Sequence, residues 1–382
     1  MRNAKCQTLT PTTFYLNTKL RRDDEFRGLF TEDEYRDVHG YFAAHPELAP
    51  TPLKRLRSIA RELGIAELYA KDETGRFGIN AFKIVGVSYA IHRLGDDAAT
   101  RGLVCATAGN HGRAVARVAH RKHVRSTIFV PAIRSSDPIE IATRQARVDA
   151  MRADGATVVD VDGTYEDAVR EAAAFGERTG GTIVSDTSWP GYEEIPRFIM
   201  AGYTHILEEA SSQWDPPPLL GAPATQAPSL VIVQGGVGGL VCAAASWFAH
   251  RFGKDRPYFV AAEPENAACL MMSAQAGYPI TIDSSLDTIM AGLRCAEPSP
   301  AAWPAVAAGV DAFVAIPDAA ALDAMKMMSA APVEERIDAG PSGACGLAAL
   351  VSIARKAEFQ AVRSAAGWTD STRALVIVTE GR

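Results

Sequence analysis

Short apolar runs alternate with longer amphipathic stretches along most of the chain. In the first half, the apolar runs are rich in β-branched residues, which predicts strands at 103–107, 127–131, 157–161 and 183–186. Longer stretches with helical spacing separate them, at 112–120, 138–154 and 164–179. Short strands separated by helices of this length predict βαβ units and a parallel sheet.

A proline-rich stretch at 215–229 interrupts this pattern and predicts a crossover between domains. A second series of strands follows it, at 230–234, 258–263, 312–316 and 375–379. Near the start of the chain, residues 32–45 have the spacing of one amphipathic helix. The chain therefore predicts two parallel-sheet α/β domains with the active site in the cleft between them.

Composition narrows the class of protein. The 382 residues are 47% hydrophobic and 22% charged with a net charge of −6, which excludes a disordered chain and a strongly basic polyanion binder. The N-terminal residues lack an apolar segment of secretory length, and Gln234 and four glycines interrupt the most apolar stretch, 230–249. Six cysteines without a CxxC motif are typical of a reducing compartment, so we expect a cytoplasmic protein without a membrane span.

A glycine-rich loop, QGGVGG at 234–239, lies between a predicted strand and a predicted helix. Its backbone N–H groups and the positive end of the helix could bind a phosphate, although a tight turn with close packing would use the same glycines. The loop lacks the G-x-G-x-x-G spacing, and no G-x-x-x-x-G-K-[ST] motif occurs in the chain. These observations favour a phosphate-bearing ligand that is neither ATP nor a conventionally bound NAD.

Two further stretches carry candidate chemistry. Lys83 lies near the start of an otherwise apolar helix, where burial would lower its pKa and make its amine nucleophilic. A lysine that extends to solvent at a helix end is the alternative. The ATAGNHG loop at 106–112 follows a strand and could bind a carboxylate through its N–H groups, or be an ordinary turn. Within it, His111 is a candidate ligand or base, with a hydrogen-bonded structural histidine as the alternative.

Six motifs together resemble a known family. KDETGRFGINAFK, ATAGNHGRAVA, SDTSWPGYEEIP, EPENAACL, TIMAGLRC and VIVTEG run in the order found in fold-type II pyridoxal-phosphate enzymes, the tryptophan synthase β-like group. Within that group the motifs are most similar to those of the diaminopropionate ammonia-lyases. The resemblance implies an α/β protein with a discontinuous cofactor-binding domain, 1–95 and 212–382, and a small domain, 96–211. It also implies pyridoxal 5'-phosphate as cofactor and a homodimer.

The same resemblance implies a role for each matching residue. Lys83 would bind the cofactor covalently and act as catalytic base, with Asp186 as the acidic catalytic residue. Asn110 would hydrogen-bond the cofactor ring oxygen, and Thr379 would meet the pyridine nitrogen, where a neutral hydroxyl does not enforce a protonated ring. The cofactor phosphate would bind to Gly235, Gly236, Val237, Gly238 and Gly239. The substrate would bind to Thr107, Ala108, Gly109 and His111, without a metal ion.

The implied reaction is α,β-elimination from a small amino acid to a 2-oxo acid and ammonia. For 2,3-diaminopropionate the products would be pyruvate and ammonia. Ala108 stands where the ammonia-lyases have the aspartate of ATDGNHG, which serves as base for the D-isomer, so the L-isomer is favoured. A serine, threonine or hydroxyaspartate dehydratase and a non-catalytic amino-acid-binding relative remain alternatives, and a nicotinamide-dependent oxidoreductase is a more distant one. We expect neither nucleic acid nor a membrane as a partner.

Cys269 and Cys295 coincide with a cysteine pair near the active-site entrance of the ammonia-lyases. A reducing cytosol favours two free thiols. The resemblance leaves a disulfide open.

Overall fold

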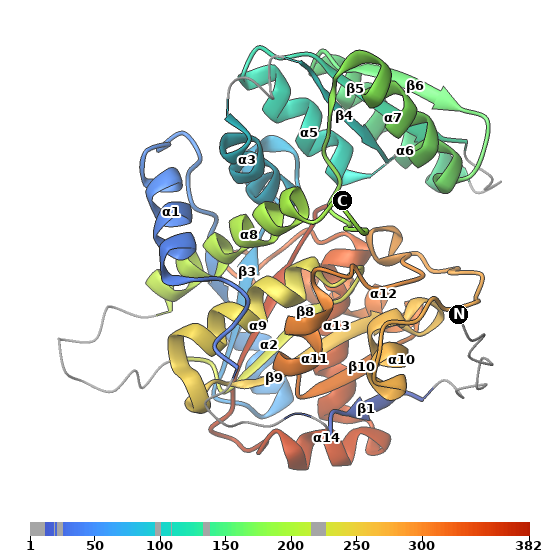
Figure 1. Cartoon of the computed structure of the whole chain (residues 1–382). Helices are drawn as coiled ribbons and strands as arrows, with labels where there is room; N and C mark the ends of the chain where they lie inside the picture. Colours follow the sequence, from blue (N-terminus) through green and yellow to red (C-terminus); the bar gives the residue numbers. More distant parts are fainter. Residues whose placement is uncertain are drawn as a thin grey trace.

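Two β-sheets with helices on their faces make up the protein (Figure 1). The computed structural model describes residues 12–18, 20, 26–95, 101–107, 109–132, 138–214 and 227–382. The larger sheet has the strand order β1-β10-β9-β8-β11-β3-β2, and the smaller one has the order β6-β5-β4-β7. Two separate sheets of α/β type agree with the predicted fold class.

The larger sheet has a parallel centre and antiparallel edges. Strands β10, β9, β8, β11 and β3 are parallel to their neighbours, while β1 pairs antiparallel with β10 and β2 with β3. The strands are β1 (Phe14–Leu16), β2 (Leu53–Arg55), β3 (Glu67–Asp72), β8 (Leu230–Gln234), β9 (Tyr258–Pro264), β10 (Ala312–Ile316) and β11 (Arg373–Val378). The four strands predicted for this series are confirmed, and β1, β2 and β3 were not predicted.

The smaller sheet is parallel throughout, as the βαβ pattern predicts. Its strands are β4 (Leu103–Ala106), β5 (Ser126–Pro131), β6 (Thr157–Val161) and β7 (Thr182–Ile183). The strand predicted at 183–186 is wrong in extent, because only Thr182 and Ile183 pair with β4 and Asp186 lies beyond the ladder. Helices α5 (Asn110–Arg121), α6 (Pro138–Ala153) and α7 (Tyr165–Thr179) alternate with these strands where the sequence predicts them.

The N-terminal helix α1 (Glu32–Ala43) also forms as predicted, and begins with a capping box between Thr31 and Glu34. Helices α2 (Arg57–Leu63), α9 (Gly239–Phe252), α10 (Cys269–Ala276), α11 (Trp303–Gly309), α12 (Asp318–Ala330), α13 (Pro341–Arg355) and α14 (Gln360–Ala365) accompany the larger sheet. Short 3-10 helices are η1 (Arg76–Gly78), η2 (Gly253–Asp255), η3 (Glu265–Ala267), η4 (Ala291–Leu293) and η5 (Ala357–Phe359). Among the described residues, no helix combines the length and apolarity that a bilayer span needs.

Helices α3 (Lys83–Arg93) and α8 (Glu194–Gln213) pack against each other, with α8 crossing the middle of the molecule (Figure 1). Glycines allow this close approach, since a Cβ on Gly202 would lie 2.9 Å from the Cα of Gly86. Helix α3 also packs on α5 of the smaller sheet, and α8 also packs on α9. The predicted domain boundaries stay a prediction, and most of the predicted proline-rich crossover, 215–226, lies outside the described residues.

Candidate active site

The predicted site residues follow strands at their carboxyl ends, where parallel α/β sheets bind ligands. Thr107, Asn110 and His111 follow β4, and Asp186 follows β7 of the same sheet. The glycine loop follows β8, and Thr379 follows β11 of the larger sheet. The two sheets therefore contribute facing groups of residues to one region, near the C-terminus in Figure 1. Ala108 lies outside the described residues.

Lys83 is the first residue of α3, and its Nζ forms an ion pair with the Oδ2 of Asp186. About a fifth of each side chain is exposed, 22% for Lys83 and 20% for Asp186. Burial disfavours the ammonium, but the Asp186 carboxylate outweighs this effect and holds the pKa of Lys83 above its ordinary value. The predicted lowering of the lysine pKa is thus wrong, because a sequence-distant carboxylate pairs with the amine.

His111 adds a second contact to the same carboxylate. Its Nδ1 is 3.8 Å from Asp186 Oδ2, and its Nε2 is 2.9 Å from the backbone oxygen of Val184. Within the part of the chain that the structure describes, the buried Nδ1 has no hydrogen-bond partner. Burial would raise the pKa of Asp186, but Lys83 and His111 hold it below its ordinary value. Asp186 is therefore ionised beside two groups that can carry protons.

Asn110 opens α5, and its Nδ2 donates a hydrogen bond of 2.6 Å to the Oε2 of Glu380. Arg147 also approaches this carboxylate, at 3.9 Å. Beside Asn110, the Oγ1 of Thr107 accepts a hydrogen bond of 3.0 Å from the N–H of Gly109 and fixes the loop. Glu380 belongs to the TEG motif but is not among the predicted site residues, because nothing near it in sequence indicates a contact with Asn110.

The glycine loop has the backbone of an anion-binding turn. Gly238 has φ +94°, a conformation that side chains rarely adopt, and α9 starts at the next residue without an acidic side chain in its first turn. A Cβ on Gly236 would lie 3.3 Å from Cys295 Sγ, so a side chain there would crowd the loop. N–H groups at a helix N-terminus favour a bound anion, and the glycines keep its approach open.

Thr379 connects the glycine loop to the start of α3. Its Oγ1 accepts a hydrogen bond of 2.8 Å from Gln234 Nε2, at the end of the strand that precedes the loop. Its backbone oxygen accepts a hydrogen bond of 3.0 Å from the N–H of Phe82, immediately before Lys83. Thr379 is buried, with 3% of its surface exposed. The predicted cofactor residues Lys83, Thr379 and the glycine loop are thus joined through two short contacts.

Two serines missed by the sequence analysis also join the loops. Ser188, from the SDTSWPG motif, shares a hydrogen bond of 2.9 Å with the hydroxyl of Ser299. The N–H of Ser299 donates to the backbone oxygen of Val237 at 2.8 Å, which supports the glycine loop. Lone serines far apart in sequence carry no signal of such a pair.

The cysteine pair lies beside the same loop. Cys269 Sγ is 3.5 Å from the backbone oxygen of Gly236, and Cys295 faces the same glycine. Both are free thiols in the structure. Burial raises the pKa of Cys295 to about 12, so its thiol is neutral near pH 7.

This arrangement fits a phosphorylated aldehyde cofactor. Lys83 supplies the amine, the start of α9 supplies N–H groups for a phosphate, and the orphaned Nδ1 of His111 marks a polar group without a partner in the described protein. A family model described as pyridoxal-phosphate dependent enzyme matches residues 45–367. The chain belongs to this family, and pyridoxal phosphate is its cofactor.

Among the proteins that this chain is similar to are diaminopropionate ammonia-lyases. The chain is 32% identical to diaminopropionate ammonia-lyase of Salmonella typhimurium over 373 residues, which cover 90% of this chain and 88% of the relative. A structure of the Escherichia coli enzyme in complex with an aminoacrylate–PLP azomethine reaction intermediate is similar, with a TM-score of 0.81 and 30% identity. It covers 96% of this chain and 93% of the other. A biosynthetic L-threonine dehydratase of Mycobacterium bovis is 27% identical over 80% of this chain and 65% of the relative.

These comparisons confirm the predicted fold class, family and cofactor. They also agree with the predicted class of enzyme, a pyridoxal-phosphate-dependent ammonia-lyase. The roles of individual residues stay predictions.

Proposed function

We propose that this protein converts L-2,3-diaminopropionate and water to pyruvate and two molecules of ammonia by α,β-elimination. The ion pair between Lys83 and Asp186 is the observation that carries this proposal, because it places an ionised carboxylate beside the amine that is to exchange a proton with the substrate. The similarity to the Salmonella typhimurium enzyme supports the choice of substrate. Pyridoxal phosphate, once bound, supplies an electron sink for the carbanion formed at the substrate Cα.

Lys83 is the general base in this proposal. As the neutral amine, its Nζ takes the proton from the substrate Cα. The Asp186 carboxylate then stabilises the ammonium that results, which is the form that the raised pKa of Lys83 favours. The ionised Asp186 also offers an acceptor for the β-ammonium group of a diamino acid. Lys83, with His111 at 3.8 Å, holds the pKa of Asp186 below its ordinary value, so the carboxyl group is ionised.

Binding and orientation come from the loops. The N–H groups of Gly236, Val237, Gly238 and Gly239 hold the cofactor phosphate, whereas the N–H of Gly235, also predicted for this role, already donates to the backbone oxygen of Ala262 at 2.7 Å. Residues 107–111 hold the substrate carboxylate. Asn110 donates one amide hydrogen to Glu380 and keeps the second for the cofactor ring oxygen. Thr379 Oγ1 already accepts from Gln234, which leaves its hydroxyl hydrogen for the pyridine nitrogen.

The first test concerns the lysine. We expect the purified protein to be yellow, with an absorbance band that borohydride removes, and Lys83→Ala to be colourless. A Lys83→Ala protein that still forms a borohydride-reducible link to the cofactor would contradict the lysine assignment.

The second test concerns Asp186 and the substrate. Asp186→Asn should lose about 100-fold or more in kcat for pyruvate release from L-2,3-diaminopropionate, the size expected for general acid–base groups. Asp154→Asn is the matched control, because Asp154 pairs with Arg117 at 2.7 Å rather than with a predicted site residue. An equal loss of kcat in the two variants would contradict a catalytic role for Asp186.

A dehydratase of serine, threonine or 3-hydroxyaspartate is the second candidate, favoured by the similarity to an L-threonine dehydratase. Release of 2-oxo acid should be measured from both enantiomers of diaminopropionate, from L-serine and from L-threonine at matched concentrations. Higher kcat/KM on a hydroxy amino acid would favour the dehydratase, and bound cofactor without turnover would favour a non-catalytic relative.

Ala108→Asp should raise activity on the D-isomer of diaminopropionate. Efficient use of that isomer by the unmodified protein would contradict the interpretation that Ala108 disfavours it.

We also propose a homodimer in the cytoplasm. The cysteines among the described residues are free thiols, which supports a reducing compartment. Sedimentation equilibrium of the purified protein tests the dimer, because a single species of 40.8 kDa would exclude it.

A further inference from the structure

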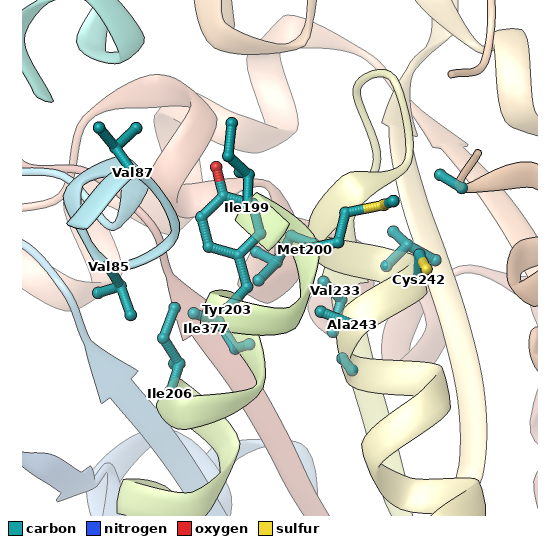
Figure 2. Close-up of a cluster of buried hydrophobic side chains, with 14 of the residues drawn as sticks. Val85, Val87, Ile199, Met200, Tyr203, Ile206, Val233, Cys242, Ala243 and Ile377 are labelled. Carbon is teal, nitrogen blue, oxygen red and sulfur yellow. The ribbon is translucent and has the colours of Figure 1, made fainter. Parts of the chain in front are cut away.

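Tyr203 lies in the middle of α8 and faces the helix that carries Lys83. A Cβ built on Gly86 would lie 2.6 Å from Tyr203 Cε1, and Gly86 is one turn after Lys83 on the same face of α3. The ring of Tyr203 also contacts that of Phe82, with centroids 4.8 Å apart. Figure 2 shows the ring between α3 and Met200, with its hydroxyl directed away from Ile206.

The other side of the ring meets the glycine loop. Tyr203 Cε2 is 3.9 Å from the position of a Cβ on Gly239, the first residue of α9. One aromatic side chain therefore lies between the Lys83 face of α3 and the N-terminal turn of α9. This is the region that the cofactor's reactive carbon and phosphate would share.

The hydroxyl of Tyr203 is buried and has no hydrogen-bond partner within the described residues. Only 1% of the residue is exposed. A buried hydroxyl without a partner costs free energy, so native proteins rarely leave one in place without a use. Burial raises the pKa of this phenol above its ordinary value, with Asp186 adding to the effect and Lys83 opposing it. Tyr203 is therefore a neutral hydrogen-bond donor.

We propose that the Tyr203 hydroxyl donates a hydrogen bond to the phosphate group of pyridoxal phosphate and completes the anion site of the glycine loop. The proposal rests on the assignment of that loop to the phosphate. It accounts for a buried donor that the protein alone does not satisfy, beside a helix N-terminus that attracts an anion. A phosphate oxygen is a charged acceptor, which makes this hydrogen bond stronger than one between neutral groups.

The test compares pyridoxal phosphate with pyridoxal, which lacks the phosphate. Equilibrium binding of each to the full-length, cofactor-stripped protein is measured by absorbance titration for the wild type and for Tyr203→Phe. We expect Tyr203→Phe to raise the Kd for pyridoxal phosphate about tenfold or more, since hydrogen bonds to charged groups are worth that much. The Kd of Tyr203→Phe for pyridoxal should stay within about twofold of the wild-type value, because pyridoxal lacks the phosphate that the hydroxyl would bind.

Tyr35→Phe is the matched control. Tyr35 also has a buried hydroxyl without a partner among the described residues, but it lies on α1. Its ring stacks on that of His250, with the two centroids 4.3 Å apart. This variant should change neither Kd. Circular dichroism of all three proteins checks that each is folded.

Each other outcome overturns the proposal. If Tyr203→Phe weakens both ligands equally, the hydroxyl acts on something other than the phosphate. If it keeps the wild-type preference for pyridoxal phosphate, the glycine loop binds the phosphate without Tyr203. If the wild type itself shows no preference, the loop assignment fails together with the proposal, whereas a failed lyase assay leaves these Kd values unaffected.

Discussion

Replacing Gly86 by alanine sets two opposing effects against each other in α3. A Cβ at this position would lie 2.5 Å from the backbone oxygen of Ile199 and 2.8 Å from its Cγ2. Real Cβ atoms essentially never approach so closely, and the backbone oxygen of a packed helix cannot rotate away. Gly86→Ala must therefore push α3 and α8 apart.

The magnitudes favour destabilisation. Alanine is better than glycine in a helix interior by about 1 kcal/mol. Overpacking a well-packed interface costs about 1–3 kcal/mol and sometimes more, and here the contact involves backbone atoms. Gly40→Ala in α1 isolates the first effect, because nothing lies within 4 Å of a Cβ at Gly40. We expect Gly40→Ala to gain up to about 1 kcal/mol and Gly86→Ala to lose about 1–3 kcal/mol.

Urea unfolding followed by tryptophan fluorescence measures both variants. Pyridoxal phosphate must be held at one saturating concentration, because bound ligand adds to the apparent stability. The slopes against urea should match the wild type, so that a shifted midpoint reports stability alone. If Gly86→Ala is as stable as Gly40→Ala, α3 and α8 do not approach each other as closely as these distances require.

Two further predictions concern Glu263 and Thr164. Burial raises the pKa of Glu263 to about 8, although the N–H groups of Leu270 and Met271 favour its charged form. Because the pKa is raised on folding, the stability that Glu263 contributes is present below its ordinary pKa of 4.5 and is lost as the pH rises through about 8. The urea midpoint of the wild type should therefore fall relative to that of Glu263→Gln over this range, and parallel pH profiles would contradict the shift. Thr164→Ala removes the N-cap of α7, where Thr164 Oγ1 accepts from the N–H of Asp167. It should cost about 1 kcal/mol by urea unfolding, whereas Thr164→Ser should keep most of that stability.

Periodicity predicted the central strands because their residues are buried on both faces. Strands such as β8 are entirely buried and entirely apolar up to Gln234, which is a pattern typical of a strand in the interior of a parallel sheet. The edge strands β1 and β2 have three half-buried residues each, too few to show an alternation. Strand β3 was hidden by Lys71 and Asp72, whose charges suggest a surface although both residues are buried.

The sequence predicted which residues belong to the candidate site but not which of them contact each other, because a local motif indicates a residue and not its distant partner. Glycine spacing indicated an anion loop, and the resemblance supplied roles for Lys83 and Asp186. The pairing of these two residues, 103 positions apart, depends on how the two sheets meet. Because of that pairing, the pKa of Lys83 is raised rather than lowered as the sequence predicted. The contact of Asn110 with Glu380, 270 positions apart, was hidden for the same reason.

Three of the contacts that join the loops of the two sheets involve site residues or a residue close to one. Lys83 binds Asp186, Asn110 binds Glu380, and Ser188 binds Ser299, each pair linking a loop of the smaller sheet to the larger one or to α3. A substitution at Asp186 therefore removes a reacting group and also one of these links. Loss of kcat alone cannot separate the two effects, but Ser188→Ala can, because it weakens a link without touching the reacting groups. If Ser188→Ala reproduces the loss of Asp186→Asn, the arrangement of the sheets rather than the carboxylate limits the reaction.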